Sequence, residues 1–114
     1  MPEITPVLTL QVERTGTTTV VRCSGRLVSG VQDVLYSRVK ELIPDSKRIV
    51  LDLTDLTRLD SMGLGALVRL YVSARSSGCT LELTNLGKQI WIVLKTANLL
   101  SAFSVVGEHY IKMG

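Results

Sequence analysis

The sequence has few residues of the kinds that build common catalytic and metal sites. It contains a single histidine, His109, and two cysteines, Cys23 and Cys79. One histidine cannot form a multi-histidine metal site, and the cysteines lack the Cys-x-x-Cys spacing of zinc ribbons and thiol redox sites. We expect His109 to be an exposed tail residue and both cysteines to be buried free thiols. We therefore predict neither a metal nor a cofactor.

Motifs of nucleotide-binding proteins and hydrolases are missing as well. No Walker phosphate loop and no Gly-x-Ser-x-Gly nucleophile motif occur, so a nucleotide-binding protein or NTPase has no support. Asp55 and Asp60 lie close enough in sequence to suggest a Mg²⁺ site or an acid–base pair. The simpler interpretation makes Asp55 a turn former and Asp60 an acid at a helix N-terminus. We predict that the protein is not an enzyme.

Aromatic residues, charge blocks and long apolar runs are also scarce. Aromatic residues make up 4% of the chain, which leaves little material for base stacking, and the net charge of +3 is scattered. No apolar run approaches the roughly 20 residues that span a bilayer. The first ten residues, MPEITPVLTL, lack the features of a signal peptide. We expect a cytoplasmic protein without direct contact to nucleic acid or membrane.

What remains is the composition of an ordinary globular domain, with 46% apolar residues in 114. Alternating and helical periodicity predict a single domain over residues 1–114, with a core at about 7–106 and flexible ends. The predicted strands are 7–14, 18–24, 48–53, 79–83 and 103–106, and the predicted helices are 31–43, 61–76 and 88–96. The order β-β-α-β-α-β-α-β indicates an α/β fold, a mixed sheet with helices packed mainly on one face.

The stretch Leu51–Ala74 is the most distinctive part of the chain. It reads LDLTDLTRLDSMGLGALVRLYVSA, which we interpret as a strand ending at Leu53, a polar loop, and a helix that begins near Ser61. Either Asp60 or Ser61 could cap this helix, because both side chains accept hydrogen bonds from the first free N–H groups.

Two glycines occur in the first turn of that helix, where glycine is unfavourable. Gly63 and Gly65 each cost about 1 kcal/mol relative to good helix formers. Glycine at such positions lets another backbone or another chain approach closely. Met62 and Leu64 beside them could lie at the surface, where an apolar contact implies a partner.

These residues resemble a known family. LDLTDLTRLDSMGLGALVRL is similar to the signature of STAS domains, specifically the bacterial anti-sigma factor antagonists. The downstream segment GCTLELTNLGKQIWIVLKTANLL also fits the strand, turn and helix of that family. The resemblance extends from about Val7 to Val106 and implies a STAS-like sheet.

The resemblance also implies a function in transcription regulation, for example in a bacterial stress response. In that family a GHKL-type anti-sigma factor kinase phosphorylates the serine after the aspartate, which is Ser61 here, and a PP2C-type phosphatase reverses the reaction. The unphosphorylated antagonist, expected to be monomeric alone, binds the kinase, and the sigma factor is released. The partner-binding residues implied by the motif are Arg26, Asp60, Ser61, Met62, Gly63, Leu64 and Gly65.

The sequence departs from the family pattern at two places. Met62 stands where a small hydroxyl residue is common, so Ser61 is the only acceptor hydroxyl. Gly25-Arg26-Leu27-Val28 stands where the family usually has Gly-Glu-Leu-Asp, so an acidic residue near the phosphorylation site is replaced by Val28. Arg26 could bring a positive charge to the interface or could simply be exposed.

A second function remains open, namely that of a STAS interaction module in a stressosome-like scaffold or a lipid-transport complex. Such modules often belong to larger proteins or complexes and need not keep the serine. A freestanding domain with Ser61 in place favours the antagonist.

Overall fold

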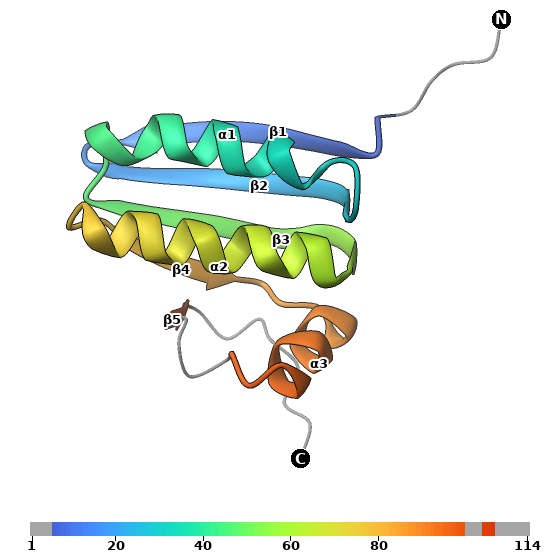
Figure 1. The fold of residues 1–114 in the computed structure, drawn as a ribbon. Helices are drawn as coiled ribbons and strands as arrows, with labels where there is room; N and C mark the ends of the chain where they lie inside the picture. Colours follow the sequence, from blue (N-terminus) through green and yellow to red (C-terminus); the bar gives the residue numbers. More distant parts are fainter. Residues whose placement is uncertain (1–5, 100–103, 107–114) are drawn as a thin grey trace, which may run out of the picture.

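The computed structural model describes residues 6–99 and 104–106, in which three helices accompany a five-stranded sheet (Figure 1). His109, Phe103 and the ends predicted to be flexible lie outside the described residues. The elements in chain order are β1 (Leu8–Thr15), β2 (Thr18–Leu27), α1 (Gln32–Leu42), a 3₁₀ helix (Ile43–Asp45), β3 (Arg48–Leu59), α2 (Ser61–Ser76), β4 (Thr80–Thr84), α3 (Lys88–Thr96) and β5 (Ser104–Val106).

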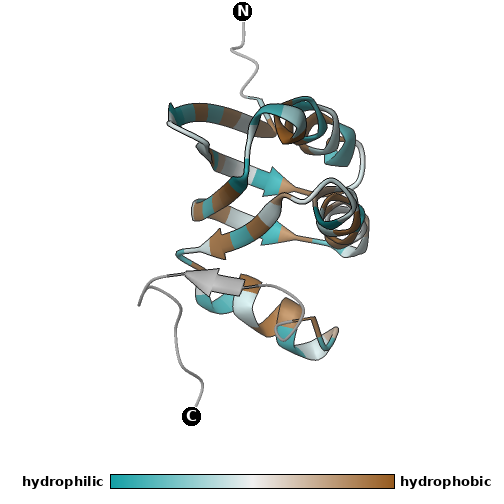
Figure 2. Cartoon of the chain, turned by 90° about the vertical axis from the view of Figure 1, so that its left-hand side faces the viewer, coloured by the Kyte–Doolittle hydropathy of each residue, from teal (hydrophilic) through white to brown (hydrophobic). Residues whose placement is uncertain are grey.

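The sheet is mixed, and its strand order follows the chain, β1-β2-β3-β4-β5. β1 and β2 form an antiparallel hairpin, whereas β2–β3, β3–β4 and β4–β5 are parallel pairs that a helix connects each time. α1 and α2 lie side by side over one face of the sheet, and α3 lies toward the β4–β5 edge (Figures 1 and 2). The predicted α/β class, element order and helix placement are confirmed.

The core lies between the sheet and the helices. Strand side chains that point toward α1 and α2 are fully buried aliphatic residues, such as Val21, Leu51 and Leu83. The opposite face is more polar: the Arg48 guanidinium donates to both Glu82 carboxylate oxygens at 2.6 and 2.8 Å. Burial on one face and ion pairs on the other set the register of the strands, because a slip of one residue would exchange the two faces.

β3 is twice as long as the sequence predicts. The polar pair Thr54-Asp55 suggests a turn, but the strand continues through it to Leu59. The register between β3 and β2 shifts at two places. The first shift lies between the pairs Arg22–Asp52 and Ser24–Asp55. The second lies between the pairs Gly25–Leu56 and Arg26–Arg58. Each shift inserts one extra residue in β3, which is a β-bulge. The bulges allow buried leucines at a spacing of three, Leu53, Leu56 and Leu59.

β2 is also longer than predicted, since the segment expected to be a loop from Gly25 is strand up to Leu27. Gly25 has φ +108°, and a Cβ there would lie 2.2 Å from the carbonyl oxygen of Val7. The neighbouring Arg26 N–H donates to that same oxygen at 2.8 Å. Glycine is thus needed for the close approach of β1, not for a turn. The extension carries Arg26 to the end of the sheet next to α2.

Two smaller expectations can be compared with the structure. Cys23 and Cys79 are both buried free thiols, as predicted, and burial raises the pKa of the Cys23 thiol to about 12. Within residues 6–99 and 104–106, no helix has both the length and the apolar character needed to cross a membrane.

Candidate functional site

The site is organised by Asp60, which stands between the end of β3 and the start of α2. One carboxylate oxygen accepts the N–H groups of Met62 and Gly63 at 3.0 and 2.9 Å, and the other accepts the N–H of Ser29 at 2.8 Å. The first two bonds cap the helix, and the third ties the β2–α1 connection to it. Asp60, not Ser61, is therefore the N-cap.

Hydrogen bonds also set the charge state of this cap. The N–H groups of Gly63 and Ser29 lower the pKa of the Asp60 carboxyl, with smaller contributions from the N–H of Met62 and from the nearby Arg58. Each of these groups favours the ionised form. Asp60 is consequently a stable anion at neutral pH, and both of its carboxylate oxygens accept backbone N–H groups.

Ser61 is the first residue of α2, and its side chain is exposed. Among the described residues no hydrogen-bond partner holds its hydroxyl, so the capping role considered for Ser61 belongs to Asp60 alone. Met62 beside it is also exposed, at 48%, although it is a large apolar residue. A free hydroxyl and a solvated methionine thus lie together on the outer side of the first turn.

The two glycines of the first turn have different roles. A Cβ on Gly63 would lie 2.1 Å from the carbonyl oxygen of Leu27, so α2 packs directly on the backbone at the end of β2. Gly63 is buried by this contact and does not present a surface to a partner, which corrects its expected role in partner binding. A Cβ on Gly65 would meet nothing within 4 Å, and that residue is exposed.

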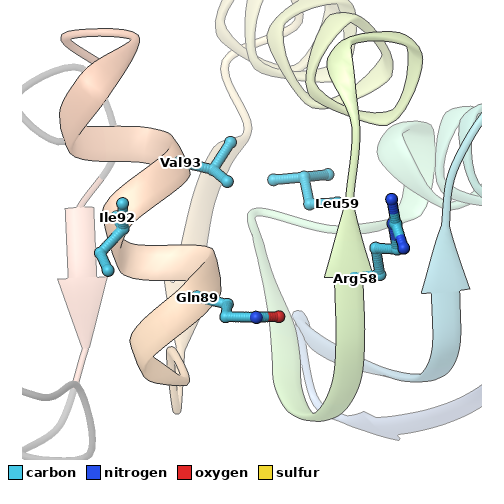
Figure 3. A pocket seen from close by; sticks show the side chains of 5 residues that line it. All are labelled: Arg58, Leu59, Gln89, Ile92 and Val93. Atoms are coloured by element: carbon cyan, nitrogen blue, oxygen red, sulfur yellow. The ribbon is translucent and has the colours of Figure 1, made fainter.

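Next to Ser61 lies a hollow between the end of β3, the start of α2 and α3, which we call the α3 groove. It consists of two adjoining pockets of about 470 and 340 Å³ that share Leu59, Ile92 and Val93. Leu59 and Val93 point toward each other across it, and Gln89 points into the gap (Figure 3). The smaller pocket reaches Ser61 and Leu64. The smaller pocket is mainly apolar, and an apolar pocket that adjoins an exposed hydroxyl suits a protein partner.

Most of the site residues expected from the sequence lie together at the start of α2, whereas Arg26 lies on another element. Asp60, Ser61, Met62, Leu64 and Gly65 all lie at the start of α2, where Leu64 is partly buried at the rim of the groove. Arg26 lies exposed at the end of β2, which is compatible with both of the alternatives considered for it.

Sequence reasoning did not identify four of the groove residues, Arg58, Gln89, Ile92 and Val93. Arg58 falls in the segment predicted to be a polar loop, and the other three fall in the predicted helix 88–96. The residue that could have indicated the groove is Ile92, because it is an apolar residue on the otherwise polar face of that helix. Its side chain is 39% exposed in the structure.

The carboxylates near the site do not converge. Asp55 forms an ion pair with Arg22 at 3.3 Å and lies within β3, so it is not the turn former that the sequence suggested. Asp60 is occupied as the helix cap. Across the described ranges, no group of three or more histidine, cysteine or acidic side chains lies close enough to hold a metal ion.

The contact between Gly63 and Leu27 predicts opposite effects for two similar substitutions. Gly63→Ala should lower the free energy of unfolding by about 3 kcal/mol, because the new methyl group overlaps backbone that cannot rotate away. Gly65→Ala should be neutral or stabilising by up to about 1 kcal/mol, because the helix gains a better former in open space. Urea denaturation of both variants measures the difference, and equal effects would contradict the contact.

The hydrogen bonds of Asp60 predict a dependence of stability on pH. A lowered folded-state pKa contributes stability that is present above the unfolded value of about 3.9 and is lost as the pH falls through the folded pKa. Asp60→Ala should therefore unfold at lower urea than the wild type at pH 7, and the gap should narrow in acid. Asp60→Asn keeps an acceptor but cannot titrate, so its gap to the wild type should be smaller at pH 7 and should also narrow in acid; a gap that stays constant for both variants would contradict the lowered pKa of Asp60.

Comparison with known proteins places this geometry in a family. A STAS domain model matches residues 9–109. The structure of unphosphorylated SpoIIAA, an anti-sigma factor antagonist of Bacillus, has a TM-score of 0.74 and 19% identity, over 88% of this chain and 90% of that one. An anti-sigma factor antagonist from Mycobacterium paratuberculosis has a TM-score of 0.78 and 20% identity, over 89% and 86% of the two chains.

A further similar structure comes from a different class of protein. It is a sulfate transporter family protein from Wolinella succinogenes, with a TM-score of 0.68 and 20% identity, over 82% of this chain and 75% of that chain. At such identities the similarity of structures concerns the fold alone, whereas the family match covers most of the sequence. The chain belongs to the STAS domain family.

Proposed function

We propose that this protein is an anti-sigma factor antagonist that is switched by phosphorylation of Ser61. Without phosphate it binds an anti-sigma factor kinase of the GHKL type, so that the sigma factor is released. Phosphorylation by the same kinase abolishes binding, and a PP2C-type phosphatase restores it. The protein has no catalytic activity of its own in this scheme, because it is the substrate of both enzymes.

The observation that carries the proposal is that Asp60 and Ser61 have separate roles at the start of α2. The Asp60 carboxylate caps the helix, so the Ser61 hydroxyl is not needed as a cap and is exposed. A kinase can reach such a hydroxyl without unfolding the helix. The adjoining α3 groove and the exposed Met62 offer apolar contact to the protein that delivers the phosphate.

The charge of a phosphate explains how one modification could release the partner and leave the fold intact. A phosphoserine carries about −1.5 to −2 charges at neutral pH. The helix dipole favours an anion at the start of α2. The N–H groups of Met62 and Gly63 are already bonded to Asp60, so they do not draw the phosphate inward. The phosphate therefore remains on the outer side, where it meets the partner.

A second function has one specific observation in its favour, the similarity to a sulfate transporter family protein. A STAS interaction module of a transporter or scaffold complex would use the same surface without a phosphate switch. Affinity purification that recovers a transporter subunit, together with no phosphorylation of Ser61 by any kinase, would favour this function.

The switch predicts the outcome of a phosphorylation assay. We expect one of the GHKL-type kinases encoded in the source genome, each purified and supplied with ATP, to add a single phosphate to the wild-type protein. Ser61→Ala should accept none, whereas Ser77→Ala, which alters an exposed serine at the other end of α2, should be modified normally. Intact mass and peptide mapping measure both, and phosphate on Ser61→Ala contradicts the assignment.

The charge mechanism predicts a difference between two substitutions of similar size. Ser61→Asp should bind that kinase at least tenfold more weakly than Ser61→Asn, because only aspartate introduces a negative charge. Both variants should unfold like the wild type, since the side chain is exposed. Calorimetric titration measures the affinities, and equal weakening by both substitutions would mean that bulk, not charge, controls binding.

A further inference from the structure

Two arginines face each other at the end of the sheet that adjoins Ser61. Arg26 of β2 and Arg58 of β3 are directly paired in register, and so are the next residues, Leu27 and Leu59. The two leucines are buried, which means that the arginines project from the opposite side of their strands, and both are exposed. Like charges directly opposite each other on neighbouring strands destabilise a sheet. An anion bound between the two guanidinium groups would relieve this repulsion.

The described part of the chain supplies no ion-pair partner for either arginine. The nearest acid in electrostatic terms is Asp60, whose pKa Arg58 helps to lower. However, the carboxylate of Asp60 already accepts hydrogen bonds from Ser29, Met62 and Gly63. By contrast, Arg22 and Arg48 on the same two strands each have a carboxylate within 3.3 Å. The guanidinium donors of Arg26 and Arg58 are therefore left for an external anion.

One member of the arginine pair, Arg58, lines the α3 groove. Arg58 lines the larger pocket together with Leu59, Ile92 and Val93, and it extends from β3 toward the end of β2, where Arg26 lies (Figure 3). The groove continues to Ser61 through the smaller pocket. A basic spot, an apolar hollow and the phosphorylatable hydroxyl thus form one continuous surface.

We propose that Arg26 and Arg58 together bind one carboxylate of the partner protein, while an apolar side chain next to that carboxylate enters the α3 groove. This inference rests on the proposed function, because it describes the kinase segment that this antagonist recognises. Guanidinium groups suit the task, since they bind carboxylates with two parallel hydrogen bonds. A phosphate on Ser61 adds negative charge at the other end of the groove whose larger pocket Arg58 lines, and repulsion between this charge and the carboxylate weakens binding.

The composition of the surface favours an acidic protein segment over a nucleic acid. Two arginines are few for a phosphate backbone, and Asp55 and Asp60 at the same end of the sheet would repel one. The apolar groove would also remain empty against a phosphate chain, whereas a peptide with one acidic and one apolar side chain fills both parts.

The first test uses the kinase that phosphorylates Ser61. Arg26→Glu and Arg58→Glu should each weaken its binding at least tenfold. Lys47→Glu makes a similar change of charge at an exposed position at the other end of β3, and it should change affinity less than twofold. Circular dichroism and urea denaturation verify that the variants fold. Wild-type affinity in both arginine variants overturns the inference and leaves the phosphorylation switch intact.

The second test needs no kinase and separates the two proposals. The probe is the capped tripeptide N-acetyl-Leu-Glu-Leu-amide, with the glutamine analogue as its control. In NMR titrations the acidic peptide should shift the side-chain N–H signals of Arg26 and Arg58 and the methyl signals of Ile92 and Val93. The glutamine analogue should shift the arginine signals far less. Equal shifts, or none, overturn the inference, whether or not a kinase is found.

Discussion

The carboxylate of Asp60 is the interaction on which the site depends. It accepts three backbone N–H groups that come from two segments, the β2–α1 connection and the first turn of α2. The backbone N–H of Asp60 also approaches the carbonyl oxygen of Leu27 at 3.4 Å, and Gly63 packs against that carbonyl. The Asp60 carboxylate therefore fixes the start of α2, and the absence of a side chain at Gly63 lets it pack against the end of β2. Ser61 is exposed because its neighbours hold the helix in place.

The residues of the motif alternate between internal and external roles along the first turn. Asp60 and Gly63 make contacts within the domain, whereas Ser61, Met62 and Gly65 are exposed. A helix with this arrangement can present a hydroxyl to an enzyme without losing its own capping. The same arrangement separates two kinds of substitution: changes at Asp60 and Gly63 act on the fold, whereas changes at Ser61 and Met62 alter the exposed surface.

Much of this could be predicted from the sequence because the signals are local. The bounds of α3, the start of α2 and the end of α2 shortly before Gly78, which has a φ of +74°, follow from periodicity and from residues that favour helix ends. The length of β3 could not be predicted, because the polar residues after Leu53 read as a turn. They remain in the strand through two bulges that depend on pairing with β2, which is a long-range property.

The same long-range pairing explains why Arg58 was missed. Once β3 reaches Leu59, Arg58 lies opposite Arg26, and the end of β3 extends beyond its paired segment with β4, which stops at Asp52. α3 packs along this overhang, and the α3 groove is the space between them. The α3 groove thus exists because β3 extends beyond the strand segment that β4 pairs with. A local sequence motif does not contain this information.

In the proposed switch, a single phosphate has to weaken partner binding without unfolding the domain. Two like unit charges about 4 Å apart repel by about 4 kcal/mol at an effective dielectric constant of about 20, which corresponds to roughly a thousandfold in affinity. Within the domain the cost is smaller, because the helix dipole favours an anion at the start of α2. The proposed modification would therefore act mainly on the complex and little on the fold.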